Sequence, residues 1–284
     1  MSGILSIVGT PIGNLDDLSP RAARTLADAD IIACEDTRVT RVLLQRAVAG
    51  RGHAKLLAMH ARNEQARVPE LVRAVAGGSR VALVTDAGMP GLSDPGHRLI
   101  EACVEAGLHV EVVPGPSAVP AALVASGLPT ARFVFDGFLP RTASARRKRI
   151  EALAPEERTL VIFEAPHRLV ASLKDLADLL GPRRAAVARE LTKLHEEVIR
   201  GTLPELAGRF AESGVRGEVT IVIEGAPAAA RGAVDAGGLA GEVAAEMSAG
   251  RAKRESIAAV AARNKVPKKV VYQAVLDHGP SDED

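Results

Sequence analysis

The 284-residue sequence contains no tryptophan and one tyrosine, and aromatic residues make up only 2% of it. A hydrophobic core must therefore be built from alanine, valine, leucine and isoleucine, and few side chains are available on which nucleic acid bases could stack. The formal net charge is +1, from 36 basic and 35 acidic residues. This balance excludes capture of nucleic acid by overall charge and leaves only local basic patches to consider.

Cysteine and long hydrophobic runs are also scarce. Two cysteines, Cys34 and Cys103, in a chain of this length predict reduced thiols in a cytoplasmic protein rather than a disulfide framework. No run reaches the roughly 18 apolar residues of a membrane span, and residues 1–9 lack the basic segment and long apolar stretch of a signal peptide. We therefore expect a soluble, cytoplasmic protein with no membrane partner.

Several familiar motifs are missing. The sequence has no P-loop, no Gly-x-Gly-x-x-Gly and none of the paired Cys or His spacings of a zinc site. Its seven histidines are scattered, and His167 is the only one beside a polar cluster at a predicted strand end. The sequence thus gives no indication of a metal site.

The most informative segment that is present covers residues 82–96, Ala-Leu-Val-Thr-Asp-Ala-Gly-Met-Pro-Gly-Leu-Ser-Asp-Pro-Gly. It begins as a short apolar run typical of a strand and continues as a loop rich in Asp, Gly and Pro. Glycine permits close approach of a ligand, and Asp86 falls where the strand ends, which is where open α/β sheets bind ligands. An ordinary turn could have this composition, but similar loops at 9–13 and 114–116 follow other strands. We expect the three loops to meet at one edge of a sheet.

The order of elements predicts two α/β domains and a small helical C-terminal module. In residues 1–115 short strands alternate with helices, which is typical of a parallel sheet. Residues 116–225 predict a second α/β domain with longer strands, which we expect to be more antiparallel. Residues 226–238 are rich in Ala and Gly and predict a linker, and residues 239–284 contain three helical patterns, the last two of which fit a helix-turn-helix.

The expected strands cover residues 4–8, 31–34, 55–58, 81–84, 110–113, 133–138, 159–163, 185–188, 195–201 and 218–224. The expected helices cover residues 20–28, 39–47, 64–76, 97–106, a stretch from 118, and 169–180, 204–212, 239–248, 254–264 and 267–277.

Seven polar or Gly/Pro-rich segments follow one another along the chain, at residues 9–15, 35–38, 86–90, 93–96, 114–118, 164–168 and 189–193. Together they resemble the small-subunit ribosomal RNA cytidine 2'-O-methyltransferases, which belong to the tetrapyrrole methylase fold family. The resemblance covers essentially the whole chain. One departure is Met89, where that family usually has Thr, which removes a hydrogen-bonding side chain from the loop and leaves its backbone contacts intact.

The resemblance implies S-adenosylmethionine (AdoMet) as cofactor, bound in a cleft between the two α/β domains, and it implies a homodimer. The cofactor-lining positions that it implies are Pro11, Asp86, Gly88, Ser117, Ala118, Ala165, Leu191 and Thr220. The residue types agree in part, since a carboxylate at a strand end suits the methionyl or ribose groups and small residues leave room for adenine.

Methyl transfer to a ribose hydroxyl needs alignment of that oxygen with the methyl group and help in removing its proton. The candidates at strand ends are Glu35, Asp36, Glu190 and Lys193. Each could equally be a structural ion-pair member beside Arg38 or Arg189. The base is therefore left open among the four.

Two basic segments are candidates for contact with RNA. Residues 141–149 carry five positive charges and no acid, and residues 251–269 carry seven against Glu255 alone. Such runs are usually solvated helix faces, but a position behind a linker and beside a helix-turn-helix pattern favours phosphate contact. The expected partner is 16S rRNA or the 30S subunit, and the expected RNA-binding residues are Arg38, Arg146, Arg147, Lys148, Arg168, Lys268 and Lys269.

Two alternatives remain beside an rRNA ribose methyltransferase. One is a methylase of the same fold that acts on a corrin or porphyrin precursor, although those enzymes usually carry a Gly-x-Gly-Pro-Gly-Asp loop after the first strand where this chain has residues 9–14. The other is a nucleic-acid-binding protein that senses AdoMet without turnover. The scarcity of aromatic residues favours the ribose oxygen of a cytidine over a base nitrogen as methyl acceptor, since a base would be gripped by stacking.

Overall fold

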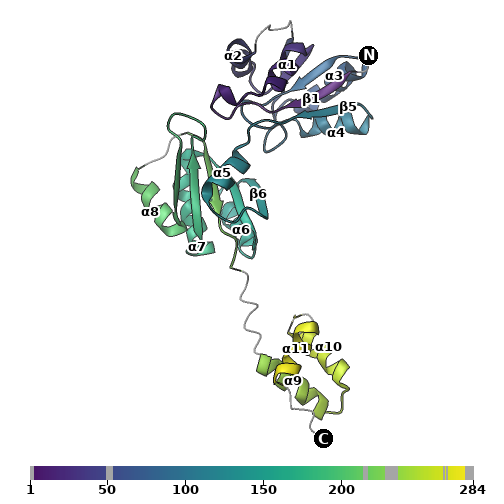
Figure 1. Cartoon of the computed structure of the whole chain (residues 1–284), viewed down its shortest axis with the longest axis vertical. Coiled ribbons are helices and arrows are strands. Elements are labelled where there is room, and N and C mark those ends of the chain that lie inside the picture. The colour runs from purple at the N-terminus through teal and green to yellow at the C-terminus, as the bar shows by residue number, and fades with distance from the viewer. Residues whose placement is uncertain are drawn as a thin grey trace. The chain divides into compact units, whose positions relative to one another are not determined.

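The computed structural model describes residues 3–48, 54–213, 217–227, 236–264, 266 and 268–278. The chain divides into two compact units, Met1–Ala226 and Pro227–Asp284. The first unit runs from purple to green in Figure 1, and the second is the yellow group of helices. Each unit is described by itself below.

The first unit begins with a five-stranded sheet in the order β3-β2-β4-β1-β5, and every pairing in it is parallel. Its strands are β1 Ile4–Val8, β2 Ile31–Cys34, β3 Lys55–Ala58, β4 Arg80–Leu83 and β5 His109–Val113. Its helices are the 3-10 turn η1 Leu15–Asp17, α1 Pro20–Asp28, α2 Thr37–Ala47, α3 Glu64–Ala76 and α4 His97–Glu105. The predicted parallel sheet is confirmed.

Both faces of this sheet are covered, because successive side chains of a strand point to opposite faces. Val8 and Ile32 pack with α1 and α2 on one face, whereas Leu5 packs with α3 and α4 on the other. The two cysteines lie in these two separate clusters, Cys34 in the first and Cys103 in the second, and both are buried and free. They form no disulfide, as the sequence predicted.

A second five-stranded sheet has the order β6-β7-β10-β8-β9. Its strands are β6 Phe133–Phe138, β7 Thr159–Glu164, β8 Arg184–Arg189, β9 Glu197–Thr202 and β10 Val219–Ile223. Only the β6–β7 pairing is parallel, which confirms the more antiparallel character predicted here. The helices are α5 Ala118–Ser126, α6 Ala143–Leu153, the 3-10 turn η2 Pro166–Arg168, α7 Leu169–Leu180 and α8 Leu203–Ser213.

The structure contains a helix, α6, that the sequence did not predict. Its buried residues are Arg146, Ile150 and Leu153. Because an arginine occupies one position of the buried stripe, the segment lacks the apolar periodicity that marks a helix. Its sequence therefore indicates only a run of charge.

The second unit is a three-helix group with a core of its own. Its helices are α9 Ala236–Ser248, α10 Lys253–Arg263 and α11 Lys268–His278. Its core contains Leu239, Val243, Val260 and Val271. Helix α9 starts inside the predicted linker 226–238. Residues 228–235 of that linker lie outside the described residues. Lys265 and Pro267, which belong to the predicted helix-turn-helix connection, lie outside them too. No helix in the described part of the chain has the length and apolar character needed to cross a lipid bilayer.

The three Gly/Pro loops meet at the carboxyl edge of the parallel sheet, as predicted. Thr10 and Gly88 exchange two backbone hydrogen bonds, of 2.9 Å and 3.1 Å, and join the loop after β1 to the loop after β4. The loop after β5 also packs tightly against the loop after β1, since a Cβ atom on Gly115 would lie 2.8 Å from the Gly9 backbone. No residue larger than glycine fits at either of these two positions without movement of the backbone.

We expect Gly115→Ala to lower the free energy of unfolding by about 1–3 kcal/mol, because the added methyl group overpacks two backbones against each other. Gly208→Ala in α8 is the matched control, since a Cβ atom there meets nothing within 4 Å. That control should raise stability by about 0.5–1 kcal/mol because alanine favours the helix. Urea denaturation of both variants measures the difference, and equal effects would contradict the packing argument.

Candidate active site

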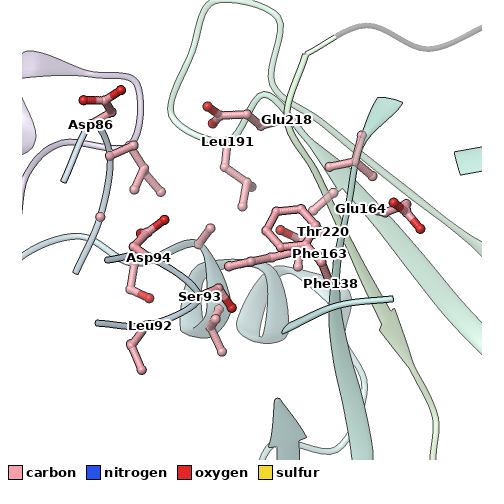
Figure 2. A pocket seen from close by; sticks show the side chains of 18 of the residues that line it. Asp86, Leu92, Ser93, Asp94, Phe138, Phe163, Glu164, Leu191, Glu218 and Thr220 are labelled. Carbon is pink, nitrogen blue, oxygen red and sulfur yellow. The ribbon is translucent and has the colours of Figure 1, made fainter. Parts of the chain in front are cut away.

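A cavity of about 390 Å³ lies where the carboxyl edge of the parallel sheet meets the second sheet. Its walls come from the loop after β4, the N-terminus of α5, the end of β7 and the start of β10. Figure 2 shows the carboxylates of Asp86 and Asp94 on one side of the cavity and the rings of Phe138 and Phe163 on the other. Its size falls in the range of small-molecule sites.

Seven of the eight positions expected to line the cofactor border this cavity. They are Asp86, Gly88, Ser117, Ala118, Ala165, Leu191 and Thr220. The eighth, Pro11, borders a neighbouring cavity together with Thr10 and Lys193. Residues scattered over more than a hundred positions of sequence are thus gathered around one space.

The cavity is apolar on one side and acidic on the other. Phe163 packs edge-on against Phe135 with 4.9 Å between ring centroids, and Phe138 tilts against Phe163 at 5.5 Å. Phe138 is 55% exposed. Among the lining residues that the structure describes there is no Lys, Arg or His, and Glu35, Asp86 and Asp94 carry carboxylates, whereas Glu164 is paired with Arg168 and Glu218 with Lys193. Such a cavity suits a ligand that bears positive charge and a flat apolar group.

Three of these carboxylates are held in a state that disfavours ionisation. Burial raises the pKa of Asp94 to about 6, and the neighbouring charges of Glu35, Asp86 and Glu218 act in the same direction. Burial also raises the pKa of Glu35, with a further contribution from Asp86. The pKa of Asp86 is raised by desolvation, although its Oδ1 accepts a hydrogen bond of 3.0 Å from the Asp36 backbone N–H. Clustered carboxylates with raised pKa values in a cavity are typical of functional sites.

Three of the four candidates for the general base, Asp36, Glu190 and Lys193, do not border this cavity, and the choice of base stays a prediction. Asp36 caps the N-terminus of α2 and pairs with Arg38 at 2.6 Å, and hydrogen bonds from Arg38 lower its pKa to about 2. Lys193 Nζ lies 3.0 Å from Glu190 and 3.3 Å from Glu218. Although burial lowers the pKa of Lys193, the two carboxylates raise it further, so the amine stays protonated. The hydrogen bond from Lys193 lowers the pKa of Glu190.

Glu35 is the one of the four that borders the cavity, and Asp94 is a residue that was not among them. Asp94 stands in Ser93-Asp94-Pro95-Gly96, eight residues after Asp86 in the same loop. The preceding Ser93 has a φ of +64°, a left-handed conformation that is uncommon outside glycine. The sequence indicated Asp94 only as an acidic residue in the loop 82–96. Its position in the cavity depends on the path of the backbone, which the sequence does not reveal.

The basic segment 141–149 is largely neutralised by acids from other elements. Arg146 is 7% exposed and its Nη2 lies 2.6 Å from Asp175. Arg147 contacts Asp175 at 2.7 Å and Asp178 at 3.2 Å, and Arg149 pairs with Asp136. The structure contradicts the expectation that Arg146 binds RNA, because its guanidinium is buried against Asp175 of α7. Lys148 remains exposed.

Arg168 is also used internally rather than presented to a partner. Its Nη2 donates to the backbone carbonyls of Leu139 at 2.7 Å and Pro140 at 3.0 Å, and its Nε lies 3.3 Å from Glu164. Its side chain is 16% exposed. These contacts hold the turn after β6 against the end of β7, so Arg168 positions the cavity wall and does not belong to an RNA surface.

We expect Asp175→Ala to destabilise the protein by about 3–5 kcal/mol, because it leaves Arg146 buried without a partner. Lys148→Ala is the control, because Lys148 lies on the exposed face of α6, the helix that carries Arg146. It should change the free energy of unfolding by about 0.5 kcal/mol or less. Chemical denaturation of the two variants gives the comparison. A small effect of Asp175→Ala would mean that Arg146 reaches solvent.

Known proteins that resemble this chain carry the name ribosomal RNA small subunit methyltransferase I. The one from Synechocystis sp. is 44% identical over 280 residues, which cover 97% of this chain and 98% of that relative. The one from Thermotoga maritima is 45% identical over 223 residues, which cover 99% of that relative but 78% of this chain. The relative from Thermotoga maritima thus matches, over its whole length, a part of this chain that is about as long as the first unit of this chain.

The fold has solved counterparts. The crystal structure of the methyltransferase CobJ aligns with a TM-score of 0.60 and 23% identity, over 79% of this chain and 95% of that one. Residues 5–207 match the family model described as Tetrapyrrole (Corrin/Porphyrin) Methylases. AdoMet is the methyl donor of this family. On this match and on the relatives that cover nearly its full length, the chain belongs to the tetrapyrrole methylase family.

Proposed function

We propose that the chain is an AdoMet-dependent methyltransferase that methylates the ribose 2'-hydroxyl of a cytidine in 16S rRNA. The observation that carries the proposal is its 44% identity to a ribosomal RNA small subunit methyltransferase over nearly all of both chains. The acidic cavity at the edge of the parallel sheet is the proposed place of the reaction. The ribose oxygen as acceptor is inferred from the sequence motifs and from the carboxylates described below.

The residues that border the cavity fit AdoMet. Helix α5 starts at the cavity with Ser117, whose side chain makes no capping hydrogen bond, so the first backbone N–H groups of the helix are available to a ligand carboxylate. The carboxylate of Asp86 suits positively charged and hydroxyl groups, and Ala118 and Ala165 leave room for a flat ring. When bound, AdoMet supplies an electrophilic methyl group on a positively charged sulfur atom.

Asp94 is the proposed proton acceptor. Transfer of the methyl group to the ribose oxygen would break the carbon–sulfur bond of AdoMet and leave S-adenosylhomocysteine, and Asp94 would take the hydroxyl proton on a carboxylate oxygen. A base works best when its pKa lies near the working pH, and the pKa of about 6 at Asp94 meets this condition better than that of about 2 at Asp36. Glu35, which borders the same cavity, contributes negative charge that keeps the proton on Asp94 once it has been transferred.

The charge of the cavity argues against a porphyrin or corrin precursor as substrate. Such precursors carry several carboxylates, which would be repelled by Glu35, Asp86 and Asp94 in a cavity whose described lining has no cation. The likeness to CobJ at 23% identity concerns the fold alone. An RNA substrate needs only to insert a neutral ribose and base, while its phosphates stay outside on basic residues.

The second unit is proposed to contribute RNA affinity rather than chemistry. The Thermotoga maritima relative, whose full length matches only 78% of this chain, supports this division. Within the second unit Lys268 and Lys269 are exposed, and within the first unit Arg38 and Lys148 are exposed. These four remain the proposed phosphate contacts from the sequence-based set, together with Arg147, which is shared with Asp175 and Asp178.

Incubation of the protein with labelled AdoMet and either 30S subunits or free 16S rRNA tests the proposed function directly. We expect the label in RNA and, after nuclease digestion, the added mass on the ribose of a cytidine. The methylated ribose should also protect the neighbouring phosphodiester from alkaline cleavage, since the 2'-oxygen can no longer attack it. Mass on the free base, or labelling of a porphyrin precursor instead of RNA, would contradict the proposal.

We expect the pH profile of kcat/KM for AdoMet to rise through about pH 6, because Asp94 accepts a proton only in its ionised form. Below that pH the carboxyl is protonated and the rate should fall tenfold per pH unit. Asp94→Asn should lower kcat by roughly 100- to 10,000-fold and remove this limb, and calorimetry should show a much smaller change in AdoMet affinity.

Asp36→Asn is the matched control for Asp94→Asn. Asn also caps helices, so α2 is kept, and Asp36 already has a pKa of about 2. Its profile should therefore retain the limb near pH 6. If both variants lose the limb, or neither does, Asp94 is not the proton acceptor.

A further inference from the structure

A second cavity, of about 580 Å³, lies within the three-helix second unit. Its lining residues are Lys253, Arg254 and Ile257 from α10 and Lys268, Lys269 and Tyr272 from α11. We call it the α10–α11 groove. All four basic side chains are exposed, and Tyr272, the one tyrosine of the chain, is 50% exposed.

The two helices present the same arrangement to the groove. In α10 the cations Lys253 and Arg254 stand four and three residues before Ile257, and in α11 Lys268 and Lys269 stand four and three residues before Tyr272. Residues at these spacings lie on one face of a helix. The groove is therefore a basic rim over one apolar and one aromatic side chain.

These four cations differ from Arg251 and Arg263 of the same unit, which are paired with acids. Arg263 lies 2.5 Å from Glu246 and 3.5 Å from Glu242, and Arg251 also pairs with Glu246. By contrast, the side chains of Lys253, Arg254, Lys268 and Lys269 make no ion pair or hydrogen bond with any residue that the structure describes. Among the described residues these four cations are therefore not paired with acids as the arginines of α6 are, and Glu255 is the one acid in the first turn of α10.

The four cations lie where positive charge lowers the stability of the unbound protein. Lys253 and Lys268 are the first residues of α10 and α11, and the N-terminal turn of a helix carries partial positive charge. Four positive side chains in two such turns reduce stability until an anion lies between them. Phosphates of a nucleic acid supply that charge at a regular spacing, and a half-exposed tyrosine supplies a face for a base.

We propose that the α10–α11 groove binds a single-stranded segment of RNA, with phosphates on Lys253, Arg254, Lys268 and Lys269 and one base stacked on Tyr272. A duplex would offer the same phosphates, but its bases are stacked on one another and cannot reach the ring. The proposal rests on the proposed function for the identity of the RNA and adds how the second unit holds it. It differs from the usual role of a helix-turn-helix, in which one helix enters the groove of a duplex.

The test is binding of the full-length protein to a fluorescently labelled single-stranded RNA decamer at several salt concentrations, followed by anisotropy. The fourfold variant K253Q/R254Q/K268Q/K269Q should reduce the slope of log K against log salt concentration by up to about 3, because each phosphate that the protein neutralises contributes about 0.7 to that slope. Tyr272→Leu should weaken binding roughly tenfold without changing the slope.

Arg263→Gln is the control, because it removes one positive charge from α10 at a residue that does not line the groove. It should leave slope and affinity at the values of the unchanged protein. Thermal unfolding guards against a folding artefact, since the fourfold variant should unfold at an equal or higher temperature once its helix N-termini are relieved of positive charge.

An unchanged slope in the fourfold variant, or unchanged affinity in Tyr272→Leu, would overturn the proposal. So would tighter binding to a duplex RNA of the same length, or to vesicles of anionic lipid, when the same variants weaken that binding. The methylation assay is independent of these results. RNA bound through the groove by a protein that methylates no ribose would sink the proposed function and leave this inference standing.

Discussion

The cavity depends on the contact between two glycine backbones at the carboxyl edge of the parallel sheet. Gly9 follows β1 and Gly115 follows β5, and the two strands are paired neighbours, so their loops leave the sheet side by side. The hydrogen bonds between Thr10 and Gly88 add the loop after β4. With these three loops joined, Asp86 and Asp94 come to face the N-terminus of α5 and the second sheet across a single space.

Electrostatics divides the molecule into regions of different use, although its net charge is +1. Carboxylates gather around the cavity, where burial and mutual repulsion raise the pKa values of Asp94, Glu35 and Asp86. The described lining itself contains no Lys, Arg or His, although Arg168 and Lys193 pair with two of its acids, Glu164 and Glu218. The arginines of α6 form ion pairs with acids of neighbouring elements, whereas the lysines and the arginine of the α10–α11 groove form none with the described residues. An acidic reaction site and a separate basic surface suit a substrate whose reacting group is neutral and whose backbone is anionic.

The unmatched cations of the groove and the raised pKa of Asp94 have a common physical meaning. Each is a state that lowers the stability of the free protein, and each is relieved by a ligand of opposite charge. The strained backbone at Ser93, beside Asp94, belongs to the same class of feature. By contrast, the buried pair of Arg146 and Asp175 is complete within the chain and serves the fold.

The sequence by itself determined the succession of strands and helices apart from α6, the parallel first sheet and the convergence of the three loops. It could do so because strand and helix periodicities, and glycine and proline at strand ends, are local properties. Family motifs added the positions that border the cavity. Tertiary structure alone decided which charges are free, because Asp136 and Asp175 lie far in sequence from the arginines that they neutralise. It likewise decided that Asp94 lies in the cavity while Lys193 and Glu190 pair outside it, since burial and pKa depend on neighbours brought together only by folding.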